Sequence, residues 1–165
     1  MSSKYPKITS RLASMLESIE PSVNQYGLRY YPCDVELKNK RRANCVYFCE
    51  AEPWHSLWGI WPEDDEGKSS VDINNVLSIS ESPMRLPAKV ANKIYQAGES
   101  GMGYSIFTVC FANGHEEAYG TGNAIDFISY PQGLGPGDVV GVKPHIGRLQ
   151  IRKKAIEYSW CLFET

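Results

Sequence analysis

Apolar residues recur with helical spacing at two places in the chain. The first stripe extends from Ile8 to Ile19, and its members lie three or four positions apart. The second covers about Pro87 to Ala97, where proline suits the first turn of a helix. Gly98 follows it and favours the left-handed residue that ends many helices. The sequence therefore predicts two helices.

Other apolar runs are typical of strands. Leu28 to Leu37 and Ala43 to Glu50 flank a basic loop, and the second run is apolar on both faces. Such a strand is expected at the centre of a sheet that is covered on each side. Shorter strands are predicted at Val76 to Ser80, at Val139 to Val142, and from about Ala155 to the C-terminus.

The dipeptide Asn113-Gly114 separates two further strand candidates, 104–112 and 115–121. Asn-Gly between alternating segments is typical of a two-residue type I′ turn. That closure places Cys110 opposite Glu117. It predicts one ionisable face, made of Cys110, His115, Glu117 and Tyr119. It also predicts an apolar face that belongs to the core, carrying Phe107, Val109, Phe111, Ala118 and Gly120.

Three of the four tryptophans lie between Pro53 and Pro62, and four acidic residues occupy positions 63 to 66. Tryptophan combines a large apolar surface with an N–H group that needs a partner. The spacing of this segment fits either a helix or a strand. Because Gly59 disfavours a helix by about 1 kcal/mol, we interpret the segment as a loop that leads into a strand. The tryptophans then either anchor a core or form a binding surface.

These elements predict an α+β fold, with a mainly antiparallel twisted sheet or partial barrel of about six strands and two helices packed on it. The chain has 165 residues and no internal repeat, so we expect one globular domain over residues 1–165. The five cysteines are scattered without a Cys-x-x-Cys pair, which favours buried free thiols. No cofactor and no metal site is predicted.

The charge and hydropathy pattern bears on partners and compartment. Seventeen basic and nineteen acidic residues give a net charge of −2, which argues against attraction to nucleic acid or to an anionic membrane. No apolar run approaches the ~20 residues of a membrane span. Residues 1–6 also lack the apolar region of a secretory signal. We therefore expect a cytoplasmic protein without a membrane partner.

The residue types favour a binding or protein-interaction domain over an enzyme. Its ligand would be a small molecule, a peptide or a protein, and the carboxylates favour a basic or hydroxyl-rich one. An exposed edge strand also offers a route to a homodimer. The candidate ligand-binding residues are Trp54, His55, Trp58, Trp61, Glu63 and Asp65, together with His115, Glu117 and Tyr119 on the hairpin.

The alternative is a small metal- or thiol-dependent hydrolase that uses the His/Cys/Glu face of the 104–121 hairpin. These are acceptable zinc ligand types, and a nearby carboxylate can tune a thiol pKa. A single strand pair rarely brings enough ligands together, which weighs against this hypothesis. Nucleic-acid binding through the basic residues at 38–42 and 148–154 is disfavoured, because no aromatic residues are interleaved with them.

Ser100 lies in the segment Gly98-Glu99-Ser100-Gly101, whose composition is like that around some nucleophilic serines. A catalytic triad needs a base and an orienting acid within reach of the serine. His55 and Asp72 are only loose candidates for those roles. We therefore interpret the segment as a loop that caps the preceding helix.

Overall fold

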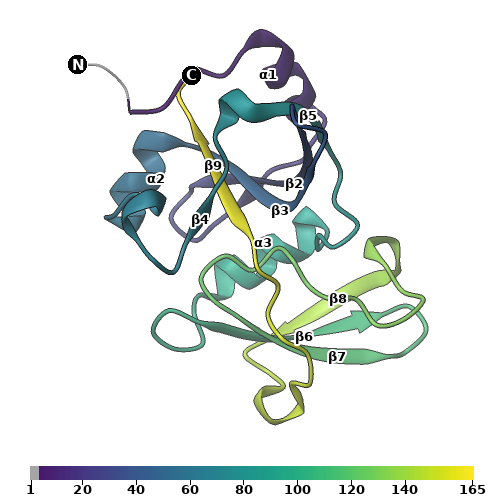
Figure 1. Cartoon of the computed structure of the whole chain (residues 1–165). Helices are drawn as coiled ribbons and strands as arrows, with labels where there is room; N and C mark the ends of the chain where they lie inside the picture. The colour runs from purple at the N-terminus through teal and green to yellow at the C-terminus, as the bar shows by residue number, and fades with distance from the viewer. Residues whose placement is uncertain (1–3) are drawn as a thin grey trace. The chain divides into compact units, whose positions relative to one another are not determined.

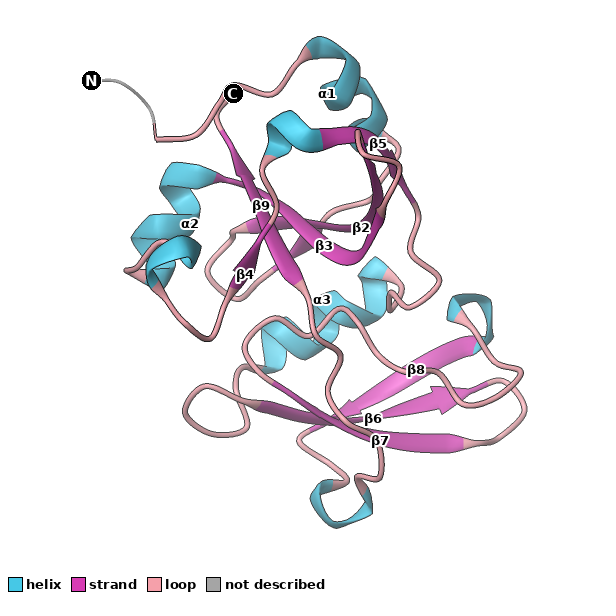
Figure 2. Ribbon diagram, viewed as in Figure 1, coloured by secondary structure: helices cyan, strands magenta, loops and turns pink. Residues whose placement is uncertain are grey.

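The computed structural model describes residues 4–165 and has an α+β fold (Figures 1 and 2). Within these residues there are three α-helices and nine strands, with 23% of the chain helical and 35% in strands. The chain divides into two compact units. Unit 1 comprises residues up to Pro21, Leu28–Ser82 and Tyr158–Thr165, and unit 2 comprises Ser22–Gly27 and Pro83–Glu157. Residues 1–3, on which the expected lack of a secretory signal partly rests, lie outside the described residues.

Unit 1 is built on a mixed sheet. Its elements are α1 (Ser10–Glu17), β2 (Arg29–Leu37), β3 (Arg42–Glu50), α2 (Ala51–Trp58), η1 (Pro62–Asp64), β4 (Ser69–Ser70), η2 (Ile73–Asn75), β5 (Val76–Ser80) and β9 (Ser159–Phe163). The strand pairs β2–β3 and β2–β5 are antiparallel, whereas β9 pairs in parallel with both β3 and β4. The sheet is therefore mixed and not purely antiparallel, because β9 adds two parallel pairs to the antiparallel ones. A parallel pair needs a long connection, and here the chain forms most of unit 2 before β9 begins.

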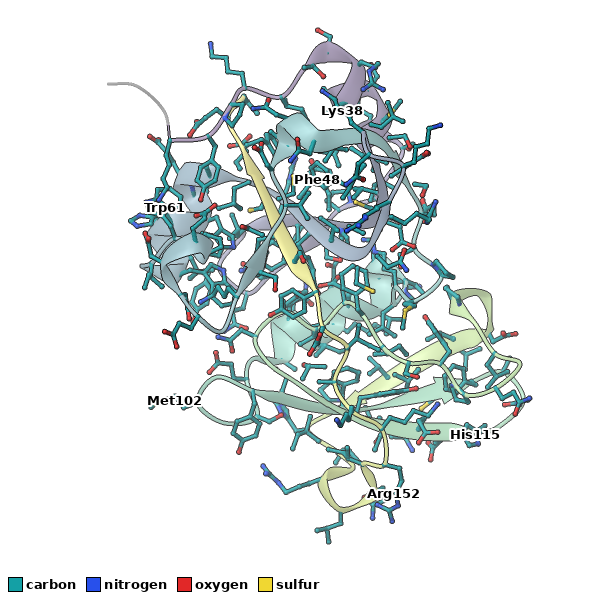
Figure 3. All side chains as sticks on the ribbon, in the orientation of Figure 1. Lys38, Phe48, Trp61, Met102, His115 and Arg152 are labelled. Atoms are coloured by element: carbon teal, nitrogen blue, oxygen red, sulfur yellow. The ribbon has the colours of Figure 1, made fainter. Side chains whose placement is uncertain are left out.

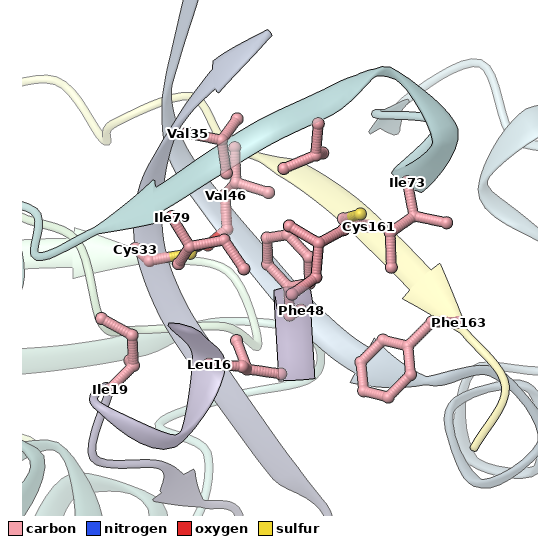
Figure 4. Packing of buried hydrophobic residues seen from close by; sticks show 12 residues of the cluster. Leu16, Ile19, Cys33, Val35, Val46, Phe48, Ile73, Ile79, Cys161 and Phe163 are labelled. Atoms are coloured by element: carbon pink, nitrogen blue, oxygen red, sulfur yellow. The ribbon is translucent and has the colours of Figure 1, made fainter. Parts of the chain in front are cut away.

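Strand β3 is central, as the sequence predicts, and each of its faces contributes to a different part of the core. Val46 and Phe48 belong to a hydrophobic cluster to which α1 contributes Leu12 and Leu16 (Figure 4). On the opposite face, Tyr47 lies within an aromatic group on the side of α2. Cys45 to Cys49 are buried on both faces of the strand, so this apolar run is covered on both sides as the sequence predicts.

The tryptophan segment is helical, and the prediction of a loop leading into a strand is wrong. The helix α2 ends at Trp58, and Gly59 adopts a left-handed conformation with φ 79°. The Gly59 amide donates to the carbonyl oxygen of His55, at 2.8 Å. Gly59 therefore lies just past the helix, where glycine is favoured, and its helix-interior cost does not apply.

Unit 2 contains a second, separate sheet where one sheet of about six strands was expected. Its elements are β1 (Ser22–Val23), α3 (Ala88–Ala97), β6 (Ser105–Phe111), β7 (Glu116–Thr121), η3 (Pro136–Asp138), β8 (Val139–Pro144) and η4 (Arg148–Gln150). Strands β7, β6 and β8 form a three-stranded antiparallel sheet with β6 in the middle.

The two predicted helices are confirmed as α1 and α3, and α2 is a third. Thr9 caps α1 by accepting a hydrogen bond from the amide of Leu12. Gly98 follows α3 with φ 79° but ψ 179°, so it is not the left-handed helical residue expected there. Within residues 4–165, no helix is both long enough and apolar enough to cross a membrane.

Candidate functional site

The aromatic rings of the tryptophan segment lie nearly parallel to one another. Helix α2 places Trp54 and Trp58 one turn apart, so their ring centroids are 5.5 Å apart and their planes differ by 11°. The chain reverses at Gly59 and brings Trp61 parallel to Trp54, with centroids 6.4 Å apart. His55 stacks on Trp61 at 4.1 Å. The local sequence thus gathers all four aromatic side chains around one short helix.

The structure assigns different roles to these tryptophans. Trp54 has no exposed surface and meets Trp160 edge-on, with ring centroids 5.3 Å apart. Trp58 is half-buried, and its Nε1 donates to the hydroxyl of Tyr30, at 3.2 Å. Trp61 is also half-buried and lies at the periphery of unit 1 (Figure 3). Trp54 is therefore a core anchor, while Trp58 and Trp61 keep part of their surface exposed.

Each of the two outer tryptophans has a lysine ammonium over its ring. The Nζ of Lys68 lies 5.0 Å from the Trp58 centroid and forms an ion pair with Asp65. The hydrogen bond from Lys68 holds the pKa of the Asp65 carboxyl below its usual value. The Nζ of Lys4 lies 5.1 Å from the Trp61 centroid. Both contacts have the geometry of a cation–π interaction.

The segment Lys4–Tyr5 lies against Trp61 and the acidic residues that follow it. Lys4 forms an ion pair with Asp64 at 3.6 Å. The ring of Tyr5 is tilted against Trp61 at 5.2 Å, and its hydroxyl donates to Glu63 Oε2 at 2.6 Å. Burial, and then the hydrogen bond to Glu63, raise the pKa of Tyr5 above its ordinary value. The carboxylates at 63 and 64 therefore already bind polar groups of the chain itself.

The hairpin has a different register from the predicted one. The amide of Phe111 donates to the carbonyl oxygen of His115, and Cys110 pairs with Glu116 instead of Glu117. Among the residues of this loop only Gly114 has positive φ, at 87°, whereas a type I′ turn needs two such residues. The loop has three residues, and the slip of one position moves the side chains of one strand to the other face of the sheet.

In the observed register the residues of the predicted ionisable face lie on two different faces of the sheet. His115, Glu117 and Tyr119 lie on the face that holds Phe107 and Phe111, and Cys110 lies on the opposite face. Phe107 and Phe111 are buried, as the sequence predicts. The predicted faces are therefore corrected. Cys110, Ala118 and Gly120 share one face, and His115, Glu117 and Tyr119 share the face of Phe107 and Phe111.

The three hairpin candidates differ in accessibility. His115 is exposed, and its Nε2 lies 3.3 Å from Glu117 Oε1. Tyr119 is buried, and its hydroxyl donates to the carbonyl oxygen of Ser129, at 2.8 Å. Burial, and then the charge of Glu117, raise the pKa of Tyr119 above its ordinary value. These residues belong to unit 2, whereas the tryptophan segment belongs to unit 1.

The hydrolase hypothesis requires Cys110, His115 and Glu117 on one face of the hairpin, and the structure places Cys110 on the other face. Cys110 lies next to Glu116, whose Oε1 is 3.5 Å from its Sγ. Burial, and then the hydrogen bond to Glu116, raise the pKa of the Cys110 thiol and so disfavour the reactive thiolate. Among residues 4–165 no group of three or more His, Cys, Asp or Glu side chains is arranged to hold a metal ion. All five cysteines are free thiols, and all but Cys110 are buried.

Two polar constellations in unit 2 are not evident in the sequence. Asp126 is fully buried and accepts hydrogen bonds from the hydroxyls of Ser22 and Tyr95. Arg85 Nη2 donates to Ser22 Oγ at 3.2 Å, which extends this buried network. Separately, Ser100 Oγ lies 2.8 Å from His145 Nδ1. The Gly-Glu-Ser-Gly segment is the sequence signal for Ser100, and no local pattern connects Ser100 with His145.

No family model, curated protein or solved structure matches this chain.

Proposed function

We propose that the protein binds a lysine-containing segment of a partner protein through Trp61 and the acidic residues that follow it. The observation that carries this proposal is the position of Lys4, whose ammonium lies over the Trp61 ring and pairs with Asp64. These contacts of the chain's own lysine support an ammonium group as the ligand of this surface. We define the acidic tryptophan surface as Leu57, Ile60, Trp61, Glu63 and Asp64.

A primary ammonium suits this surface for two reasons. The electron-rich face of an indole attracts a cation, by about 0.5–1 kcal/mol at an exposed site. A carboxylate beside the ring adds an ion pair and a directed hydrogen bond. The same combination recurs at Trp58, where Lys68 lies over the ring and pairs with Asp65. The recurrence supports recognition of ammonium groups by this segment.

Two apolar side chains close to Trp61 in the sequence add exposed apolar surface. Leu57 is 37% exposed and Ile60 is 40% exposed, although both are large hydrophobic residues. The side chains of Glu52 and Glu66 are exposed as well. Exposed apolar and acidic side chains in one segment suit a partner segment that carries an aromatic or aliphatic anchor beside a lysine.

The chain's own N-terminal segment occupies part of this surface. Lys4 and Tyr5 contact Trp61, Asp64 and Glu63. A tethered segment competes at an effective concentration on the order of millimolar. A partner must displace these two side chains. Removing their contacts should therefore raise the affinity of the surface for an added peptide.

The test is a tryptophan-fluorescence titration with a capped peptide that copies residues 4–8. We expect the double variant Lys4→Ala/Tyr5→Ala to bind this peptide about 10-fold more tightly than the unchanged chain. Trp61→Leu and Asp64→Asn, added to that variant, should each weaken binding. Glu66→Gln is the matched control, because this exposed acid lies in the same loop outside the contacts described above.

A second peptide, with both lysines replaced by glutamine, tests the role of the ammonium group. It should bind at least about 10-fold more weakly than the lysine peptide. Equal affinity for the two peptides, or unchanged affinity after Trp61→Leu, would overturn the proposal.

A further inference from the structure

Ser100 and His145 meet in unit 2, where the loop after α3 passes the end of β8. Ser100 Oγ is 2.8 Å from His145 Nδ1, and His145 Nε2 is 3.0 Å from the carbonyl oxygen of Ala97. A carbonyl oxygen can only accept a hydrogen bond, so Nε2 carries the proton of the neutral imidazole. Nδ1 therefore presents its lone pair to the Ser100 hydroxyl, which is the arrangement of a base beside a nucleophile.

The Ser100 oxygen also contacts the backbone of Ile106. The carbonyl oxygen of Ile106 lies 3.4 Å away, farther than His145 Nδ1, whereas the amide favours the charged form of the serine oxygen. The backbone amide of Ile106 donates to Ser100 Oγ at 2.8 Å. An N–H group aimed at this oxygen stabilises the negative charge that develops when the hydroxyl loses its proton. The side chain of Ser100 is half-buried and that of His145 is exposed, so reagents in solution can reach the pair.

Close backbone packing holds the two loops in place. The amide of His145 donates to the carbonyl oxygen of Ile106 at 2.7 Å. A Cβ on Gly101 would lie 2.3 Å from the ring of Tyr104, so glycine is needed for that ring to cover the loop. Arg148 donates to the Tyr104 hydroxyl at 3.0 Å and links the two loops again. Reactive side chains held on packed backbone keep a productive geometry.

We infer that Ser100 is a nucleophile with His145 as its general base, and that the pair transfers acyl groups from activated esters. Ser100 Oγ attacks the ester carbonyl carbon, and its proton passes to His145 Nδ1. The bond to the leaving oxygen then breaks, the leaving group takes the proton from His145, and an acyl-serine remains. Water hydrolyses that ester with His145 again accepting the proton, which releases the acid and restores the hydroxyl.

The surroundings of Ser100 define the substrate class. The neighbouring Met102 is 97% exposed at the tip of its loop (Figure 3). Charge that develops in so open a setting is stabilised mainly by water, which limits the gain from fixed dipoles. The substrate therefore needs a good leaving group, as in an aryl ester. This inference concerns unit 2 and is independent of the proposed peptide binding.

The first experiment treats the full chain with a fluorophosphonate probe and locates the adduct by mass spectrometry. We expect a single adduct on Ser100, and parallel hydrolysis of p-nitrophenyl acetate that Ser100→Ala abolishes. Ser80→Ala is the matched control, because this exposed serine lies on β5. Labelling elsewhere, or equal hydrolysis by the Ser100→Ala variant, would overturn the inference.

The second experiment separates a catalytic role of His145 from a structural one. His145 has φ 66°, which glycine adopts without strain, so His145→Gly removes the imidazole and tolerates the backbone. We expect the labelling rate to fall at least about 100-fold, the range of a general base. Imidazole added to the solution should restore part of the rate. A structural role alone would give no such rescue.

Two further variants keep the outcome decisive if His145→Gly is unstable. Asparagine tolerates positive φ and still offers an acceptor to Ser100, but it is not a base at neutral pH. His145→Asn should therefore fold and lose labelling to a similar extent. His115→Gln alters an exposed histidine on the hairpin and should label normally. Full labelling of His145→Asn would exclude His145 as the base.

Discussion

The indole of Trp160 stacks on the ring of Tyr47, with centroids 4.9 Å apart and planes that differ by 30°. The two residues are partners in the parallel pair of β9 and β3. Trp160 also contacts the rings of Trp54 and Trp58, each at 5.3 Å. The C-terminal strand thus carries the side chain that joins α2 to the sheet of unit 1.

Trp160→Leu should destabilise the protein much more than the same change at Trp61. Trp160 is 1% exposed, and the smaller side chain would leave a cavity among aromatic rings, so we expect the free energy of unfolding to fall by about 3 kcal/mol. Trp61→Leu should cost less than about 1 kcal/mol, because the side chain is partly exposed. Urea unfolding measures both losses. Equal losses would contradict the assigned burial.

Gly147→Ala should destabilise unit 2, whereas Gly141→Ala should have little effect. At Gly147 φ is 110°, and a Cβ there would lie 2.4 Å from Thr108 Oγ1 and 2.7 Å from the Ala118 Cβ. Positive φ and overlap with packed atoms together cost about 1–3 kcal/mol. At Gly141 a Cβ meets no atom within 4 Å. Thermal unfolding of the two alanine variants gives the comparison, and a similar melting temperature for both would refute this packing.

The Glu116–Lys143 ion pair should contribute stability over a defined pH window. Its oxygen and nitrogen are 2.5 Å apart, and hydrogen bonds from Lys143 and then from Cys110 lower the pKa of Glu116. The ion pair therefore contributes stability above the ordinary pKa of a glutamate. This contribution is lost as the pH falls through the lower pKa that Glu116 has in the folded protein. The hydrogen bond to Glu116 raises the pKa of Lys143, so at the alkaline end the contribution is lost as the pH rises through that higher value.

Glu116→Gln tests this window by urea unfolding at a series of pH values. Relative to the unchanged chain, the variant should be less stable near neutral pH and equally stable in strong acid, where Glu116 is protonated. Because both side chains are about half exposed, about 1 M salt should remove most of the difference. A difference that persists in acid or in high salt would show that the pair does not act through charge.

Several elements could be predicted because their signals are local. The stripe through Leu12 and Leu16 specifies α1, and Val76–Ser80 is a strand with the predicted bounds. The prediction failed at α2, where a glycine counted as a helix breaker proved to be the residue that ends the helix. It failed again at Asn113-Gly114, where the strong turn signal gave the hairpin but the wrong register. In both cases the position of one residue relative to the end of an element decided the outcome.

The sequence by itself determined the α+β class and the double-sided burial of β3, because apolar periodicity and capping residues act over a few positions. Only the tertiary structure decided that Trp54 is buried while Trp61 meets Lys4, since those contacts depend on side chains distant along the chain. The same holds for Ser100 and His145, which come together because the end of β8 returns to the loop after α3. Pairing of β9 with β3 likewise depends on long-range packing that no local pattern encodes.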